Sequence, residues 1–377
     1  MKELLRLLAE ADRLRRAQQP FALATVVKIN GSTYRRPGAR MLIDPDGRTW
    51  GTISGGCLEQ EVAQQALQVM EDGTPQLLPF DLSDDDLILG FGTGCNGIVH
   101  VLIEPVPAPN RTDPTLLVET CLESRRIGVL ATVIDGPKES LALGRRVLLF
   151  EDGNTHGDLP ESPLRDMLLD EAARTLNAGR HRICRVESEE EPAEVLFEVV
   201  RPPVRLVLFG TGHDVTPVVH VAKTMGWPVT IVGRKPPDVL AERFPEADDY
   251  VFLMHAQQAL DYVTFDTRSA AVVMNHHYLR DKTLVGTLMQ SPLPYIGALG
   301  PRARTERILS ELCAENETLT DEQVAQVHGP VGLDIGTETP EEIALSMIAE
   351  IQAVHHARAG GMLRDRAEAI HEIVPVL

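Results

Sequence analysis

A cysteine preceded by two glycines is the first feature of the sequence that could do chemistry. Ser54-Gly55-Gly56-Cys57 leads into a segment with helical spacing, so we expect the thiol to stand at a helix start. Backbone N–H groups and the helix dipole at such a position favour the thiolate, and the glycines let a bulky ligand approach the backbone. Because a thiolate is a soft ligand, Cys57 is a candidate for sulfur transfer or for binding a soft metal centre. The alternative is a small buried residue that only covers a helix face.

A second thiol and a short basic run accompany Cys57. Cys95 stands in its own glycine-rich loop, and it gives a two-thiol site if the fold brings that loop to Cys57; a structural role is the alternative. Arg35, Arg36 and Arg40 lie upstream of the first thiol. Clustered guanidinium groups bind phosphate or another oxyanion through paired hydrogen bonds, whereas a solvated loop is the ordinary alternative.

The second half of the chain contains a glycine turn, Gly210-Thr211-Gly212-His213, between a buried strand and a helix. This context is typical of a dinucleotide-binding turn, and it makes the two glycines and His213 candidate ligand contacts. Val215 occupies the third glycine position, however, and Gly233 stands where an acidic residue would bind the ribose hydroxyls. The motif therefore predicts the fold strongly and bound NAD weakly. Arg234 and Lys235 would favour a phosphate group instead.

A histidine pair, His276 and His277, follows the strand predicted over 270–274. Ligands bind at the carboxyl ends of the strands in parallel sheets of this kind. A histidine there can serve as an acid, a base or a metal ligand, which makes His276 a candidate ligand contact. Adjacent side chains on a regular strand do not face one metal, although a loop relaxes that objection. A loop histidine without a task is the alternative.

The elements that must position these residues fall into two α/β domains, as expected for a chain of 377 residues. Paired prolines after Arg201 mark the boundary, which gives a domain over 1–200 and a domain over 201–377. The first is a mixed α/β domain in which we expect no internal repeat. Its expected elements are helices over 4–16, 58–70 and 164–176 and strands over 21–29, 41–43, 49–53, 98–103, 125–134 and 145–150.

The second domain alternates strands with helices, which predicts a Rossmann-like, doubly wound parallel sheet. The expected strands cover 204–209, 229–232, 250–253, 270–274 and 295–296, with a helix over 213–225 after the first. Further along, Thr339-Pro340-Glu341-Glu342 has the pattern of a capping box with proline at the first helical position.

Composition excludes several classes of function. The net charge of −19 argues against a nucleic acid partner, since phosphate backbones need a basic face, but a local basic cluster can still hold a small anion. The five cysteines are scattered and form no CxxC pair, which indicates free thiols in a reducing cytoplasm. The first residues lack the apolar core of a signal peptide, and no uncharged apolar stretch is long enough to span a membrane.

Taken together, these motifs resemble the XdhC/CoxI (CoxF) family of maturation factors for xanthine and carbon monoxide dehydrogenases. The resemblance covers both domains, and the segment around Cys57 and the carboxy-terminal block are its specific parts. The segments that carry it are Gly31-Ser32-Thr33-Tyr34-Arg35-Arg36-Pro37-Gly38-Ala39-Arg40-Met41, Ser54-Gly55-Gly56-Cys57-Leu58-Glu59, Gly94-Cys95-Asn96-Gly97, Gly210-Thr211-Gly212-His213, Tyr295-Ile296-Gly297, Pro330-Val331-Gly332-Leu333-Asp334-Ile335-Gly336 and Thr339-Pro340-Glu341-Glu342-Ile343-Ala344.

The resemblance implies a chaperone that holds the molybdenum cofactor (molybdopterin), supports replacement of an oxo ligand by sulfur, and delivers the cofactor to a molybdenum hydroxylase. The family's cysteine role falls on Cys57, and a cysteine desulfurase is an implied second partner. Two other functions stay open: an NAD(P)-dependent oxidoreductase that uses the second domain, and an adaptor that binds neither ligand. A homodimer is a further expectation.

Overall fold

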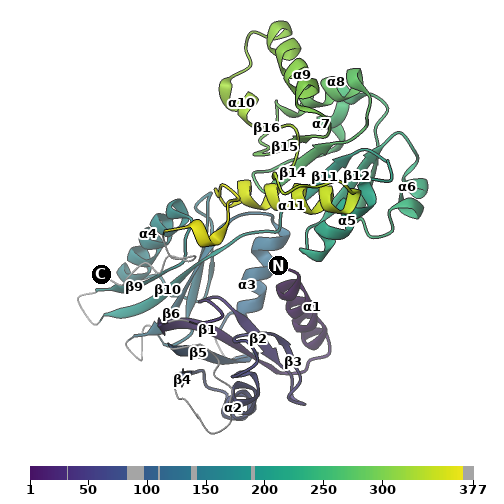
Figure 1. Cartoon of the computed structure of the whole chain (residues 1–377). Helices are drawn as coiled ribbons and strands as arrows, with labels where there is room; N and C mark the ends of the chain where they lie inside the picture. Colours follow the sequence, from purple (N-terminus) through teal and green to yellow (C-terminus); the bar gives the residue numbers. More distant parts are fainter. Residues whose placement is uncertain (32, 83–96, 109–110, 137–141, 188–191, 368–377) are drawn as a thin grey trace. The chain divides into compact units, whose positions relative to one another are not determined.

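The computed structural model describes residues 1–31, 33–82, 97–108, 111–136, 142–187 and 192–367 (Figure 1). The chain divides at Pro202 and Pro203 into an N-terminal and a C-terminal compact unit. No helix within the described ranges is long and apolar enough to cross a membrane.

The N-terminal unit contains two five-stranded antiparallel sheets. The first has the strand order β3-β2-β1-β5-β4, and the second has the order β8-β7-β6-β10-β9. The strands of the first are β1 (Phe21–Gly31), β2 (Arg40–Ile43), β3 (Thr49–Gly51), β4 (Gln76–Asp81) and β5 (Gly97–Val106). The strands of the second are β6 (Gly128–Asp135), β7 (Arg146–Phe150), β8 (Thr155–Gly157), β9 (Arg182–Val186) and β10 (Ala193–Val200).

Four helices cover the apolar faces of these sheets. Helix α2 (Glu59–Asp72) packs on the first sheet, and helix α4 (Pro163–Ala178) packs in the same way on the second. Helices α1 (Lys2–Arg16) and α3 (Pro114–Glu123) share one core with residues from both sheets. The outer face of each sheet is thus buried by a helix, and strand residues of the two sheets also pack directly on each other.

The two sheets repeat one topology, contrary to the expectation that the chain holds no internal repeat. Each half runs helix, three strands, helix, two strands, and each sheet has the same order of strands. The sequence retains traces of this repeat: Leu23-Ala24-Thr25-Val26 matches Leu130-Ala131-Thr132-Val133. The hairpins over 40–51 and 146–157 are also identical at six of twelve positions. The matches lie in the strands and turns, so helical patterns gave no sign of the duplication.

Two buried ion pairs cross between the repeats. Arg40 at the start of β2 pairs with Glu198 in β10 of the other repeat, with Nη1 2.8 Å from Oε1. Arg146 at the start of β7 pairs with Glu104 in β5, with Nη2 2.7 Å from Oε2. All four side chains are buried. Because each arginine of one repeat neutralises a glutamate of the other, the pairs fix how the repeats associate.

The C-terminal unit is built on a six-stranded parallel sheet with the order β13-β12-β11-β14-β15-β16. Its strands are β11 (Arg205–Phe209), β12 (Val229–Gly233), β13 (Asp249–Phe252), β14 (Ser269–Val273), β15 (Ile296–Ala298) and β16 (Val327–His328). Its helices are α5 (Val215–Thr224), α6 (Pro237–Arg243), α7 (Ala259–Tyr262), α8 (Tyr278–Leu288), α9 (Arg302–Glu315), α10 (Asp321–Ala325) and α11 (Pro340–His355). The order reverses between β11 and β14, which is the switch point of a doubly wound fold. The predicted fold class, a mixed α/β unit followed by a Rossmann-like sheet, is therefore confirmed.

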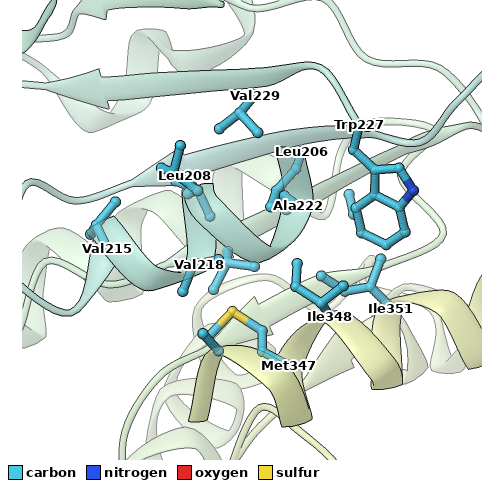
Figure 2. Packing of buried hydrophobic residues seen from close by; sticks show 14 of the residues in the cluster. Leu206, Leu208, Val215, Val218, Ala222, Trp227, Val229, Met347, Ile348 and Ile351 are labelled. Atoms are coloured by element: carbon cyan, nitrogen blue, oxygen red, sulfur yellow. The ribbon is translucent and has the colours of Figure 1, made fainter. Parts of the chain in front are cut away.

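Helices α5 and α11 bury one face of this sheet. Figure 2 shows Leu206 and Leu208 of β11 above Val218 of α5, with Met347 of α11 packed from below. Val215, which stands at the third glycine position of the turn, is fully buried in this core. The predicted capping box starts α11, because the Thr339 side chain accepts from the Glu342 N–H and Glu342 accepts in return. Helices α7, α8 and α9 cover the other face.

Candidate functional site

The loop that carries Cys57 joins β3 to α2 and is organised around one hydroxyl. Ser54 Oγ accepts hydrogen bonds from the backbone N–H groups of Gly56, Cys57 and Leu58, at 3.2, 3.1 and 3.1 Å. The Glu59 carboxylate accepts from the Ser54 N–H at 2.9 Å and also from the Ser54 hydroxyl. Partial burial raises the pKa of Glu59, but these hydrogen bonds outweigh it and hold the pKa below its ordinary value. Ser54 and Glu59 therefore fix the loop before the helix begins.

This arrangement changes the role that we expected for the backbone around Cys57. The N–H groups that were predicted to face a ligand face Ser54 Oγ instead, because the loop folds back on that side chain. Cys57 lies two residues before the first residue of α2, and its thiol is exposed. Gly56 has a φ of 111°, a conformation that favours glycine, and a Cβ there would meet nothing within 4 Å. The loop thus offers an accessible thiol beside open space.

A cavity of about 330 Å³ opens beside the thiol. The lining residues come from β5, from the loop after β1, from the Cys57 loop and from the end of β4: Thr33, Tyr34, Arg35, Ile53, Ser54, Gly55, Cys57, Leu82 and Val99. Tyr34 is 73% exposed, and a Cβ on Gly55 would lie 3.7 Å from its ring. The cavity therefore combines a free thiol, an exposed aromatic ring and largely apolar walls, which is the composition of a small-molecule site.

The three arginines that were predicted to form one anion-binding cluster have three different environments. Arg35 lines the cavity but donates to Glu3, with Nη2 2.7 Å from Oε1, and to the Thr52 hydroxyl. Arg40 is buried and committed to Glu198, so its guanidinium belongs to the interior of the unit and does not reach the loop surface. The Arg36 side chain has no hydrogen-bond or ion-pair partner among the residues that the structure describes. The predicted cluster of three is therefore wrong, and of these three arginines only Arg36 has a guanidinium without a partner among the described residues.

Cys95, the second predicted thiol, lies outside the described residues, so the two-thiol site stays a prediction. The described cysteines are all free thiols. No group of three or more histidine, cysteine or acidic side chains in the described part of the chain has the geometry of a metal site.

The glycine turn of the C-terminal unit is tightly packed. A Cβ on Gly210 would lie 2.7 Å from the Met274 carbonyl oxygen, so only glycine fits between β11 and β14. A Cβ on Gly212 would collide with the Asp214 carboxylate, which folds over the turn. In Rossmann domains this turn receives the diphosphate of a dinucleotide. A carboxylate at that place repels such an anion.

The predicted histidine pair does not converge on one ligand. His276 Nε2 lies 3.0 Å from Asp214 Oδ2 and spans the switch point, with a φ of 57° that is uncommon for a residue other than glycine. His277 caps α8, because its Nδ1 accepts from the Arg280 N–H at 3.3 Å. His213 is exposed at the turn. The structure thus joins His276 to the glycine turn and assigns His277 to the start of a helix.

Sequence reasoning missed three residues that shape these sites: Ser54, Glu59 and Asp214. Ser54 and Glu59 enclose the Gly-Gly-Cys motif, and a serine followed five residues later by a glutamate at a helix start was the available signal. Asp214 follows the glycine turn directly, and its negative charge at an expected diphosphate site was a second available signal.

Comparisons with known proteins agree with this architecture. Residues 14–81 match the model of the XdhC and CoxI family, and residues 206–351 match the model of the XdhC Rossmann domain. A protein of Bacillus subtilis (strain 168), named as a probable xanthine dehydrogenase subunit, is 34% identical over 341 residues, which cover 90% of this chain and 94% of that protein. The molybdenum cofactor insertion chaperone PaoD of Escherichia coli (strain K12) is 25% identical over 88% of this chain and 82% of its own length.

A solved structure gives the same result. The crystal structure described as a xanthine dehydrogenase from Bacillus halodurans superposes with a TM-score of 0.71 at 26% identity and covers 96% of this chain and 98% of that one. The match extends over both units, and the family models fall on the Cys57 half and on the parallel sheet separately. This protein therefore belongs to the XdhC and CoxI family.

Proposed function

We propose that this protein binds the molybdenum cofactor at Cys57 and presents it to a xanthine dehydrogenase-type molybdenum hydroxylase. The observation that carries the proposal is the exposed thiol at the edge of a cavity, on a loop held by Ser54 and Glu59. The name of the relative PaoD, a molybdenum cofactor insertion chaperone, supports a role in maturation. In this role the cofactor is cargo and not a resident group.

The side chains around the cavity suit such cargo. A thiolate is a soft ligand that matches a molybdenum or sulfur centre. Tyr34 offers an exposed ring on which a flat heterocycle can stack, and Gly55 and Gly56 leave the approach to Cys57 open. The volume of about 330 Å³ lies at the lower end of ligand pockets, so the cavity admits part of the cofactor and leaves the rest accessible for transfer.

Support for sulfuration, with a cysteine desulfurase as sulfur donor, is the finer part of this proposal. Sulfuration needs an accessible thiol at the cofactor. Among the described cysteines, Cys57 is the one that is exposed and lines the cavity. Cys95 stays a predicted second member of the site. A homodimer and a cytoplasmic location remain predictions from the sequence.

Cofactor retention by a cysteine variant tests the proposal. Wild-type protein, Cys57→Ala and Cys313→Ala are each mixed with molybdenum cofactor, desalted and assayed for molybdenum by mass spectrometry and for pterin by fluorescence. Cys313 is the matched control because its thiol is also exposed but lies in α9 of the other unit. We expect wild type and Cys313→Ala to retain both signals and Cys57→Ala to lose at least about tenfold, the effect of one strong contact. Equal retention by all three proteins contradicts the role of Cys57.

The oxidoreductase alternative has less support. The Asp214 carboxylate covers Gly212, where the diphosphate of NAD(P) would bind, and Gly233 provides no carboxylate for the ribose. Calorimetric titration with NAD and NADP tests it directly, and we expect no binding heat with either nucleotide.

A further inference from the structure

The duplicated fold of the N-terminal unit creates two related places that differ in charge. In each repeat a helix ends at a glycine in the left-handed conformation, Gly73 after α2 and Gly179 after α4. Pro75 lies two residues after Gly73 in the first repeat, and His181 lies two residues after Gly179 in the second. Pro107 lies three residues after the buried Glu104 in the first repeat, and Arg201 lies three residues after the buried Glu198 in the second. Basic side chains thus replace prolines at both matched positions.

Hydrogen bonds bring the basic residues of the second repeat together at the end of β10. Arg201 Nη2 donates to the Gly179 carbonyl oxygen at 2.5 Å, which places its guanidinium against the turn that precedes His181. Val199 donates its N–H to His181 Nδ1 at 3.2 Å. Since Nδ1 accepts this bond, the ring proton of neutral His181 resides on Nε2, and that donor has no partner in the described structure.

The loop that carries Arg36 reaches the same end of β10 from the other repeat. Gly38, two residues further on, has a φ of 94° and lies so close to Glu198 that a Cβ there would be 2.9 Å from Oε1. Arg40 Nη1 also donates to the Gly38 carbonyl oxygen at 2.9 Å. The loop is therefore held against Glu198, next to Val199, which bonds His181.

Positive charge is in excess at this place. Arg40 neutralises Glu198. The Arg36 guanidinium then has no partner among the described residues, and the Arg201 guanidinium has only a carbonyl oxygen. Three guanidinium groups against one carboxylate give an excess of two positive charges, in a chain whose net charge is −19. Burial lowers the pKa of Arg36 and of Arg201, and no described carboxylate offsets it. Two half-buried guanidinium groups without counter-charge are costly unless an anion completes the site.

We infer that Arg36, His181 and Arg201 form an oxyanion site that takes a phosphate monoester group. Guanidinium groups match phosphate oxygens in charge and in geometry, and the Nε2–H of His181 adds a neutral donor. A doubly charged phosphate also balances the excess of two positive charges. The site is separate from the cavity at Cys57, because the residues that line this cavity include Arg35 but not Arg36, His181 or Arg201. The inference does not rest on the proposed cofactor role.

The first repeat supplies a natural control, Arg111. This arginine lies at the related place beside Glu104, near Gly144, and like Arg201 it donates to a carbonyl oxygen, that of Leu143. Burial lowers its pKa, and the charges of Arg145 and Arg146 act in the same direction, whereas the Asp158 and Glu104 carboxylates oppose the shift. Three guanidinium groups therefore face two carboxylates at Arg111, an excess of one positive charge and not two, so a doubly charged anion is not required there.

Calorimetric titration of the full chain tests the site. Inorganic phosphate and glycerol phosphate are the probes, at an ionic strength held constant with chloride, in wild type, Arg36→Gln, Arg111→Gln and Cys57→Ala. Since Arg36 has no described partner to lose, its variant should keep the wild-type circular dichroism. We expect Arg36→Gln to weaken binding by about tenfold or more, which corresponds to one charge-assisted hydrogen bond, and the other two variants to bind as wild type does.

The two probes separate the sources of the anion. Tighter binding of glycerol phosphate assigns the site to a monoester on a larger molecule, and tighter binding of inorganic phosphate assigns it to the free ion; both results support an oxyanion site. The inference is overturned if wild type binds neither probe, or if Arg36→Gln and the double variant Arg36→Gln/Arg201→Gln bind both probes as tightly as wild type. Because Cys57→Ala is titrated in parallel, loss of the cofactor role leaves this result unaffected.

Discussion

The two repeats of the N-terminal unit share a topology but differ in the loop between their third strand and their second helix. In the second repeat the chain passes from β8 to Ser162, whose hydroxyl accepts from the Arg165 N–H, and α4 begins with Pro163. That is an ordinary N-cap. In the first repeat, Ser54 lies four residues before the N-cap position, gathers three N–H groups and leaves Cys57 exposed.

The comparison shows how a duplicated scaffold can carry one specialised loop. The strands, the crossed ion pairs and the covering helices are needed for stability in both repeats, so they are alike. The loop between β3 and α2 differs from its counterpart in holding a thiol in reach of a cavity. The function that we propose resides in a loop placed on a scaffold that the other repeat shares.

Loss of a crossed ion pair should have the largest effect on the free energy of unfolding, and the effect should be equal for the two pairs. Arg40→Ala removes the hydrogen-bonded ion-pair partner of the buried Glu198, and Arg146→Ala does the same to the buried Glu104. We expect each change to lower the free energy of unfolding of the N-terminal unit by about 3–5 kcal/mol. Urea denaturation followed by Trp50 fluorescence, in a Trp227→Phe background that removes the other tryptophan, measures it.

The exposed residue Arg48, which pairs with its exposed neighbour Asp46, supplies the control. Arg48→Ala should change the free energy of unfolding by less than about 0.5 kcal/mol. A large difference between Arg40→Ala and Arg146→Ala would show that the two repeats do not contribute equally to the interior.

The two serines should separate stability from function. Ser54→Ala removes the acceptor of three N–H groups, and Ser162→Ala removes one N-cap bond. We expect a loss of about 2 kcal/mol for the first and about 1 kcal/mol for the second, the range measured for caps. Only Ser54→Ala should also reduce cofactor retention in the desalting assay, because only that loop presents Cys57. Equal retention by both variants would show that the geometry of the loop does not affect cofactor binding.

Much of the fold followed from local pattern. The alternation of apolar strands and helices after Pro203 predicted the parallel sheet, and the spacing of Leu58, Val62 and Ala66 predicted α2. The internal repeat was missed because the identical segments are short and lie about 106 residues apart. They also lie in strands, and the periodicity of a strand is the same whether or not it is related to another strand.

The site was predicted less completely, since its parts depend on distant partners. Cys57 was recognised from its own neighbours, and the structure places it on a cavity. Arg40 was read as a loop cation, yet its partner Glu198 is 158 residues away and both are buried, which no local pattern reveals. Arg35 was likewise read as free, although Glu3 pairs with it from α1. The partners of charged side chains are a property of tertiary structure.

The smallest effect that we predict is a pH dependence confined to the Cys57 loop. Hydrogen bonds from Ser54 hold the pKa of Glu59 below its ordinary value, although partial burial raises it. A carboxyl group with a lowered pKa in the folded state stabilises the fold above its unfolded pKa, and this contribution disappears as pH falls through the folded pKa. Glu59→Gln should therefore remove part of the loss of thermal stability between about pH 5 and pH 3, while Glu61→Gln, which changes another acidic residue in the first turn of α2, should not. Melting temperatures recorded across that range measure the difference, and identical acid profiles for the two variants would mean that Ser54 holds the loop without the Glu59 carboxylate, as Ser162 holds the start of α4 alone.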